Sequence, residues 1–441
     1  MTTFMDWLAK AVETLEPFSD PFYADRLVAF NKLHHTDFIE SQKEHYPYIS
    51  FRETLKQLSS QLYHTKVPSE SFLEQQALPL AAVAVGYGHA TKAATLTFVN
   101  GRWAKAPSRF SYNGTGIQLR RLADLSLMEQ QEVCKGYMAD LTSSDDIFVT
   151  LNILLAQETY LLEIKDHTQL EDIIVIQHII TSSVTHVVPQ FILKIGKESQ
   201  VTIVEEWYAE GYPIQAFVNS LTHITLAESA RLTYYTLHTE YAVPFYHVHA
   251  LYCNQKDHST FTHYTFSFGS TMLRINLTDQ VQGSHATATL YGLYSLSAKE
   301  QVDHRIRVIH SCPHSFSKQL YKCILGGQST GSFHGLIYLT PDAQQTHAYQ
   351  TNNAIVLSNG AHHYVKPQLE IYADAVKCSH GATAGQLDQA QLFYLQTRGI
   401  EEPLAKRLLL EAFGIEIINT VPIKELQDYL LDKLAEKFIK L

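Results

Sequence analysis

The sequence predicts a mainly β chain whose strands lie between helical segments at the two ends. From about residue 146, runs rich in Val, Ile, Thr, Tyr and Phe follow one another for more than 200 residues. β-branched and aromatic residues favour strands. The clearest of these runs lie at 173–176, 201–204, 232–237, 261–266, 286–290 and 305–309.

The number of expected strands restricts the architecture. One open sheet seldom holds more than about 10 strands, so a double sheet, a barrel, a propeller or a solenoid is expected. Residues 151–358 contain no Asn-Gly or Asp-Gly pair, which disfavours a meander built on tight hairpins. A β-solenoid needs no such hairpins. The residues alone leave a solenoid and a β-sandwich as equal alternatives.

The first part of the chain is expected to be mostly helical. Apolar residues recur at three- and four-residue steps over 4–15, 25–33 and 52–62, and 122–137 is a further expected helix. Asn100-Gly101 lies between apolar runs and predicts a β-hairpin near 95–103, because a type I′ turn needs two residues that tolerate positive φ.

The end of the chain predicts two amphipathic helices. Pro422 suits the first turn of the second helix. Such a tail either caps the core or docks on a partner, and capping is the commoner use. The expected apolar faces are Leu404, Leu408, Ala412 and Ile415 in the first helix, and Ile423, Leu426, Leu430, Leu434 and Phe438 in the second.

Composition excludes several classes of function. The 441 residues carry a formal charge of −10 without a Lys/Arg run of five, which argues against a nucleic-acid partner. The chain has no stretch of 18 apolar residues, so no membrane span is expected. The first ten residues lack the pattern of a secretory signal. The five cysteines are odd in number, widely spaced and without a C-x-x-C, so a reducing cytoplasm is expected.

Common catalytic motifs fit poorly. The 327–331 segment matches G-x-S-x-G, but a strand-like run follows Ser329 where a nucleophile elbow needs a helix. No nucleotide-binding loop is found, so any ATP hydrolysis must come from another subunit. His247 and His249 share one face of a strand and favour a structural pair over a metal site, because no acidic residue lies nearby in sequence. His362 and His363 would point to opposite faces.

The 366–383 segment carries the most information. Cys378 and His380 are two residues apart, so their side chains lie on one face of a strand. A thiolate beside an imidazole suits iron, copper or zinc. Two ligands do not complete a site, and a buried cysteine beside a hydrogen-bonded histidine is the alternative that chemistry alone favours.

Three stretches within residues 366–400 are the most specific part of the sequence: Lys-Pro-Gln-Leu-Glu-Ile-Tyr-Ala-Asp, Val-Lys-Cys-Ser-His-Gly-Ala-Thr and Leu-Phe-Tyr-Leu-Gln-Thr-Arg-Gly-Ile. With these stretches, the segment resembles the SufB/SufD family of the SUF iron–sulfur cluster assembly system. Weaker likeness covers the strand region and the hairpin near 95–103, and 43–48 loosely matches an N-terminal element. The Cys-Ser-His-Gly-Ala-Thr motif resembles SufD rather than SufB. SufB-like chains carry a cysteine near the position of Asn352, which this chain lacks.

The resemblance implies a right-handed parallel β-helix over 146–384, after an N-terminal region at 1–145 and before a C-terminal helical region at 385–441. It implies a non-enzymatic scaffold subunit that pairs with a SufB-like subunit and is held by the SUF ATPase, a SufC-like protein. His380, with Cys378 as its neighbour, would meet a nascent cluster or iron at the interface with SufB. Tyr394, Arg398 and Gly399 would fall in the ATPase-docking region.

Other functions remain open from the sequence. A β-helix polysaccharide lyase or hydrolase would need paired carboxylates in a groove. A metal-dependent oxygenase would need two histidines and a carboxylate. The chain alone would also pair with a second copy of itself if a terminal strand or an interface patch were exposed. No cofactor is expected to bind firmly to this chain by itself.

Overall fold

The computed structural model describes residues 22–35, 92–105, 109–110, 116–142, 144–156, 158–181, 186–210, 216–241 and 245–438. The helices expected at 4–15 and 52–62, and the likeness at 43–48, lie outside the described residues. The helix expected at 25–33 is found as α2 (Tyr23–His35). The 122–137 run divides into a 3-10 turn (Leu122–Asp124) and the longer α6 (Leu127–Thr142).

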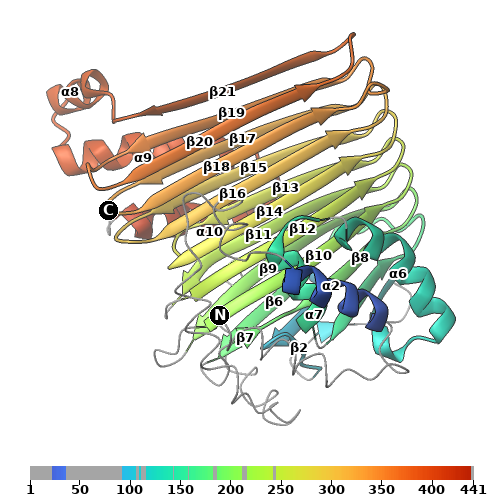
Figure 1. Ribbon diagram of the computed structural model, residues 1–441. Helices are drawn as coiled ribbons and strands as arrows, with labels where there is room; N and C mark the ends of the chain where they lie inside the picture. The colour runs from blue at the N-terminus through green and yellow to red at the C-terminus, as the bar shows by residue number, and fades with distance from the viewer. Residues whose placement is uncertain are drawn as a thin grey trace.

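Two parallel sheets face each other along most of the described chain (Figure 1). From β8 onward, successive strands alternate between the sheets, and each strand pairs in parallel with the strand two places later in sequence. This is a parallel β-solenoid, which decides between the two architectures that the residues left open. Sheet A contains β1 (Lys92–Val99), β2 (Arg102–Trp103), β3 (Arg109–Phe110), β6 (Ile173–Thr181), β9 (Gln200–Glu210), β11 (Arg231–Tyr241), β13 (Thr260–Ser267), β15 (Thr287–Leu296), β17 (Phe316–Leu325), β19 (His347–Val356) and β21 (Lys377–Gly385).

Sheet B lies opposite sheet A, and its strands are also stacked mainly in the order in which they occur in the sequence. It contains β4 (Ile117–Arg121), β5 (Thr159–Ile164), β7 (His186–Val187), β8 (Gln190–Ile195), β10 (Ala216–Leu226), β12 (Phe245–Gln255), β14 (Met272–Val281), β16 (Gln301–His310), β18 (Thr330–Leu339) and β20 (His362–Ile371). All six strand-like runs of the sequence fall in these strands, except that Ala286 lies one residue before β15. One rung of the solenoid is therefore one strand of each sheet.

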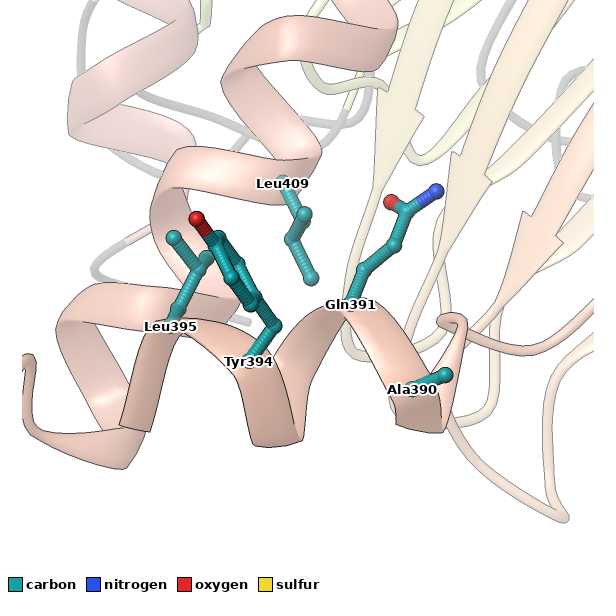
Figure 2. A pocket seen from close by; sticks show the side chains of 5 residues that line it. All are labelled: Ala390, Gln391, Tyr394, Leu395 and Leu409. Atoms are coloured by element: carbon teal, nitrogen blue, oxygen red, sulfur yellow. The ribbon is translucent and has the colours of Figure 1, made fainter. Parts of the chain in front are cut away.

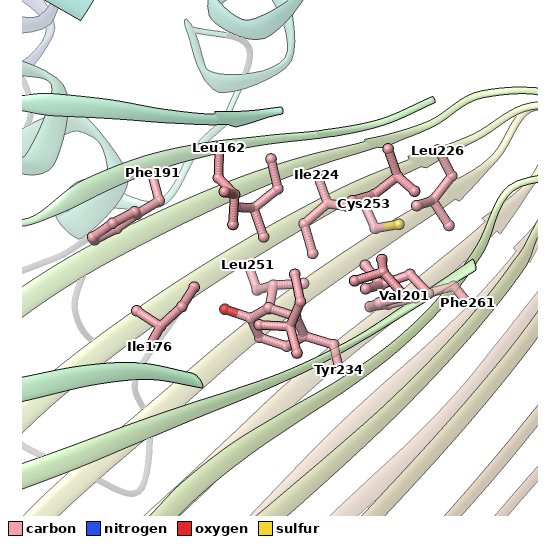
Figure 3. Packing of buried hydrophobic residues seen from close by; sticks show 14 of the residues in the cluster. Leu162, Ile176, Phe191, Val201, Ile224, Leu226, Tyr234, Leu251, Cys253 and Phe261 are labelled. Atoms are coloured by element: carbon pink, nitrogen blue, oxygen red, sulfur yellow. The ribbon is translucent and has the colours of Figure 1, made fainter. Parts of the chain in front are cut away.

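Side chains that point between the sheets form the core, and each rung is covered by the next. Figure 3 shows Ile176, Val201 and Tyr234 of sheet A meeting Ile224 and Leu251 of sheet B in this space, and all five are at most 2% exposed. Burial of one such side chain contributes about 1.5–3 kcal/mol. The hydrophobic effect thus stacks the rungs, while parallel backbone hydrogen bonds fix their register.

The corners between sheet B and sheet A repeat one backbone conformation. One residue in each corner from β5–β6 to β18–β19 has a positive φ, and none of these residues is glycine: His167, Glu198, Ser229, His258, His285, His314 and Gln345, with φ between 54° and 60°. Backbone hydrogen bonds join each corner to the next, such as the 2.9 Å bond from the His258 N–H to the Ser284 carbonyl. The repeated corner explains why Asn-Gly hairpins are not needed.

The hairpin expected near 95–103 is confirmed. Asn100 and Gly101 have φ of 52° and 81°, and β1 pairs with β2 in antiparallel fashion through Val99 and Arg102. β1 also pairs in parallel with β6, so this hairpin is the first part of sheet A.

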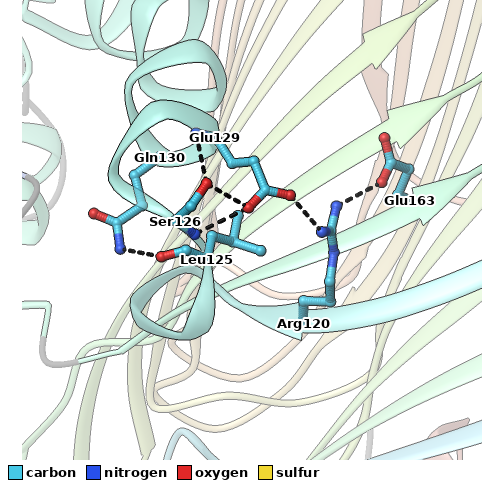
Figure 4. A network of polar contacts seen from close by, with 6 residues as sticks. All are labelled: Arg120, Leu125, Ser126, Glu129, Gln130 and Glu163. Carbon is cyan, nitrogen blue, oxygen red and sulfur yellow. Dashed lines mark hydrogen bonds and ion pairs between the residues drawn. The ribbon is translucent and has the colours of Figure 1, made fainter.

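The N-terminal helices pack on the outer face of sheet B. A capping box begins α6, in which the Ser126 N–H donates to the Glu129 carboxylate at 2.9 Å and the Glu129 N–H donates back to Oγ at 3.4 Å. Arg120 of β4 joins this helix end to the sheet, because its guanidinium contacts Glu129 at 3.2 Å and Glu163 of β5 at 2.9 Å (Figure 4). Asp146 caps α7 (Ile147–Leu155).

Two of the C-terminal helices, α9 (Glu402–Ile418) and α10 (Lys424–Phe438), pack on the outer face of sheet A. The shorter α8 (Gln389–Thr397) packs on α9. Leu426, Leu430 and Leu434 of α10 are fully buried, as expected from the sequence. Two buried lysines attach the helices, since Lys437 contacts Glu300 at 2.7 Å and Lys322 of β17 contacts Glu416.

The prediction of which face of α9 is buried is wrong. This helix buries Ala405, Leu410 and Ile417 instead, while Leu404 and Leu408 remain 50% and 39% exposed. Small Gly414 lies at the contact with α10 and β15, where an added Cβ would stand 2.7 Å from Leu434 and 3.4 Å from Leu293. The close approach at Gly414 sets which face of α9 is turned to the solenoid. None of the described helices is long and apolar enough to cross a membrane.

One buried carboxyl in the core makes stability depend on pH. Asp279 of β14 lies next to Cys253 of β12 in the interior and is fully buried. Burial raises the pKa of Asp279 to about 8. Because the folded state then holds a proton that the unfolded chain loses near pH 4, stability falls as pH rises between about 4 and 8.

We expect Asp279→Asn to remove this loss. The free energy of unfolding of the variant minus that of wild type should increase by at most about 1.4 kcal/mol for each pH unit between about pH 4 and pH 8. Urea unfolding at pH 5, 6, 7 and 8 measures the difference. A difference that does not change with pH would show that Asp279 does not stay protonated in the folded protein.

Candidate functional site

Among the residues that the structure describes, the solenoid ends in a rung that no further rung covers. β20 and β21 are the last strands of their sheets, and each is paired on one side only (Figure 1). Burial changes abruptly here: the alternating buried positions of β18 and β19 give way to exposed or half-buried residues along β20 and β21. Lumen-facing side chains of this rung therefore reach solvent at the open end.

His380 lies on β21 directly above a column of interior residues. It is in register with Gln350 of β19, which is in register with Gln319 of β17. Both glutamines are 1% exposed, and the Gln350 amide donates to the Gln319 side-chain carbonyl at 2.9 Å. Because register neighbours point to the same side, the His380 imidazole continues this interior column, yet it is exposed. The end of the coil thus presents an imidazole outward.

Cys378 shares that face but is less available. It lies above the fully buried Ala348 and packs against the cluster that contains Ile337 and Leu339. Burial raises the pKa of Cys378, and the backbone N–H of Ala348 offsets this only in part. Cys378 is half-buried and His380 is exposed, so His380 is the more accessible donor of the pair.

A buried polar cluster lies far from this end, at the rungs of β6, β9 and β12. Glu205 is 1% exposed, accepts a hydrogen bond from the Tyr234 hydroxyl at 2.9 Å, and lies 3.1 Å from His178 Nε2 and 3.7 Å from His249 Nε2. His178 also stacks on Trp207 with 3.8 Å between ring centroids. Sequence reasoning missed this cluster because its members come from four separate strands, β6, β9, β11 and β12.

The His247/His249 pair and the serine motif lie inside the fold. His247 and His249 both point into the interior, and His247 lies 2.7 Å from Ser220 Oγ, as expected for a structural pair. Ser329 is fully buried in the turn between β17 and β18, with no helix after it. Among the residues that the structure describes, no group of three or more His, Cys, Asp and Glu side chains is arranged to hold a metal ion.

The second predicted region lies on α8, which residues 386–388 join to β21. Tyr394 is 56% exposed and lines a hollow with Ala390, Gln391, Leu395 and Leu409 of α9 (Figure 2). The Arg398 guanidinium lies 5.2 Å from the Tyr394 ring and donates to its hydroxyl at 3.3 Å. Gly399 has a φ of 84° and ends the helix, which is a sufficient structural reason for glycine there.

The two helices that form this hollow carry further exposed apolar side chains. Phe393 is 67% exposed, and Leu404 and Leu408 of α9 add to the same pair of helices. We name these three residues, together with Tyr394, the α8/α9 patch. The sequence marked Leu404 and Leu408 as a buried face, so the patch was missed as a surface. Clustered exposed apolar residues mark interaction sites more often than isolated ones do.

Comparison with known proteins identifies the family. The family model described as "SUF system FeS cluster assembly, SufBD core domain" matches residues 178–413. An iron–sulfur cluster assembly SufBD family protein, slr0076 of Synechocystis sp., is 30% identical over 342 residues, which is 75% of this chain and 75% of that protein.

Two further relatives extend the comparison. The iron–sulfur cluster assembly protein SufD of Escherichia coli is 30% identical over 56% of this chain and 57% of its own length. Protein ABCI7, chloroplastic, of Arabidopsis thaliana is 30% identical over 54% of this chain and 50% of its own length. The match thus spans only about half the length of these two relatives. The chain belongs to the SufBD family of the SUF system for iron–sulfur cluster assembly, as a SufD-like member.

Proposed function

We propose that this chain is the SufD-like, non-enzymatic subunit of a scaffold complex in which iron–sulfur clusters are built. A SufB-like subunit covers the last rung, and the SUF ATPase, a SufC-like protein, holds the α8/α9 patch. The observation that carries the proposal is the exposed His380 at the top of an otherwise buried interior column. The nascent cluster or iron is cargo at the shared interface, and this chain alone does not hold it firmly.

The open end supports pairing with another β-rich subunit. The outer edges of β20 and β21 have unpaired backbone groups among the described residues, and such edges readily pair with another chain. Tyr364 and Tyr372 add exposed aromatic surface at the same end. A copy of this chain offers the same edges, so two copies would pair there when the SufB-like subunit is absent.

The docking region supports coupling to an ATPase. The chain has no nucleotide-binding loop, so ATP hydrolysis belongs to the partner. Only residues 386–388 separate α8 from β21, which carries His380. A partner that shifts α8 would therefore pull directly on the strand at the interface. None of the five cysteines forms a disulfide in the described chain, which agrees with assembly in a reducing cytoplasm.

The His380 side chain is tested by His380→Ala in the co-purified complex. We expect the complex to form as in wild type, because the substitution removes an exposed side chain. We expect anaerobic reconstitution to lose most of the cluster absorbance, because a donor at the interface is missing. His362→Ala is the matched control, since it removes an exposed histidine from the neighbouring last strand, β20. Equal cluster yields in all three proteins would refute the role of His380.

The ATPase contact is tested on the α8/α9 patch. Deletion of 385–441 would also uncover the core between α10 and sheet A, so surface substitutions are cleaner. We expect Tyr394→Ala and Leu408→Glu each to weaken ATPase binding by about 2 kcal/mol, or about 30-fold, if they lie at the centre of the contact.

Leu127→Glu is the control for these variants. Leu127 is 68% exposed but lies at the start of α6, on the side of the solenoid opposite to α9. Titration calorimetry with the purified ATPase measures the three affinities. Wild-type affinity in both patch variants would place the ATPase elsewhere.

A further inference from the structure

Three histidines occupy equivalent places in consecutive corners of the solenoid. His258, His285 and His314 are the positive-φ residues of the corners that precede β13, β15 and β17, with φ of 59°, 59° and 60°. We call them the histidine ladder. The backbone N–H groups of His258 and His314 donate to the following corner at 2.9 Å, so the ladder is built on a rigid support.

The imidazole rings of the ladder are nearly parallel. The ring centroids of His258 and His285 are 5.1 Å apart, and those of His285 and His314 are 4.9 Å apart, with an interplanar angle of 4° in both pairs. All three residues are exposed. No hydrogen bond or ion pair engages their ring nitrogens within the described part of the chain.

Neither backbone geometry nor burial requires histidine in these places. Glycine and asparagine adopt this left-handed conformation at lower cost. Equivalent corners of the same solenoid use Glu198, Ser229 and Gln345, so the fold accepts other side chains there. Exposed rings also gain little from the hydrophobic effect. Three imidazoles in succession therefore point to a use other than stability.

The surroundings of the ladder favour a cation. Asp257 directly precedes His258, and its carboxylate accepts a hydrogen bond from the Ser284 N–H at 2.7 Å, which holds the negative charge at this corner. The electrostatic influence of Asp257 and Asp342 reaches Cys312, two residues before His314. Lys256 is directed to the Gln282 side chain at 3.1 Å.

We propose that the histidine ladder is a surface site for a divalent first-row transition-metal ion, which neighbouring imidazoles share in pairs. Neutral imidazole is the commonest protein ligand for such ions. Metal–nitrogen bonds of about 2.0–2.1 Å require two ligand nitrogens closer than about 4.2 Å. Because imidazole lone pairs lie in the ring plane, two adjacent rings must rotate out of their parallel stack to bind one ion, and the exposure of their side chains leaves room for this rotation. Water completes the coordination, and His285 belongs to both pairs.

The test titrates Zn²⁺ alone into the full chain by calorimetry at neutral pH. His285→Asn removes the shared imidazole and keeps a residue that tolerates positive φ, so the fold is retained. Gln345→Asn makes the same change in the next corner of the solenoid and is the matched control. Equal melting temperatures of the three proteins verify that folding is intact.

We expect wild type and Gln345→Asn to share a Zn²⁺ site that His285→Asn loses or binds at least about tenfold more weakly. His258→Asn and His314→Asn should each keep one pair of adjacent imidazoles, so their Zn²⁺ affinities should lie between those of wild type and His285→Asn. Identical affinity and stoichiometry in wild type and His285→Asn would overturn the proposal. No Zn²⁺ binding to wild type would overturn it as well. None of these results depends on the SUF partners.

Discussion

Every rung of this protein is stabilised by the rung above it, and the last rung has none above. Parallel strands supply hydrogen bonds on both edges, and interior side chains are buried only when the next pair of strands covers them. A solenoid therefore has an uncovered end by construction. In this chain that end is formed by β20 and β21, and the side chains that would be core in any earlier rung are at the surface there.

This constraint explains why a binding end and a rigid support occur in one element. The column that contains Gln319 and Gln350 is locked by its own hydrogen bond, so the position of His380 is defined by residues far below the surface. Buried contacts of Lys322 and Lys437 attach α9 and α10 to sheet A. The α8 half of the α8/α9 patch is instead joined to β21 through residues 386–388, so it is linked to the open end by the chain itself.

Much of the fold could be predicted from the sequence, because strand propensity and the Asn100-Gly101 turn are local signals. The choice between solenoid and sandwich could not, because both use the same strands and differ only in which strands pair. The face of α9 was mispredicted for a similar reason. Periodicity shows that Leu404 and Leu408 share a face, but the close approach at Gly414 decides which face is buried.

Prediction of the site from the sequence was limited in the same way, because local spacing does not show packing. The spacing of Cys378 and His380 gave their common face, but their different exposure follows from the packing of Cys378 on Ala348 and Leu339. The cluster around Glu205 had no sequence signal, since its partners lie on β6, β11 and β12 and are brought together only by the winding of the chain. Contacts between rungs are long-range, so the spacing of motifs cannot show them.

The most direct measurement is histidine footprinting of the chain with and without a SufB-like subunit. His380 and His263 belong to one interior column, but His263 lies four rungs lower and is 1% exposed. The isolated chain is kept dilute enough to be monomeric, because pairing of two copies would cover the same end. Diethyl pyrocarbonate should then modify His380, and the partner should suppress that modification, while His263 stays unmodified in both samples. Equal modification of His380 with and without the bound partner would contradict the placement of the shared site at the open end of the solenoid.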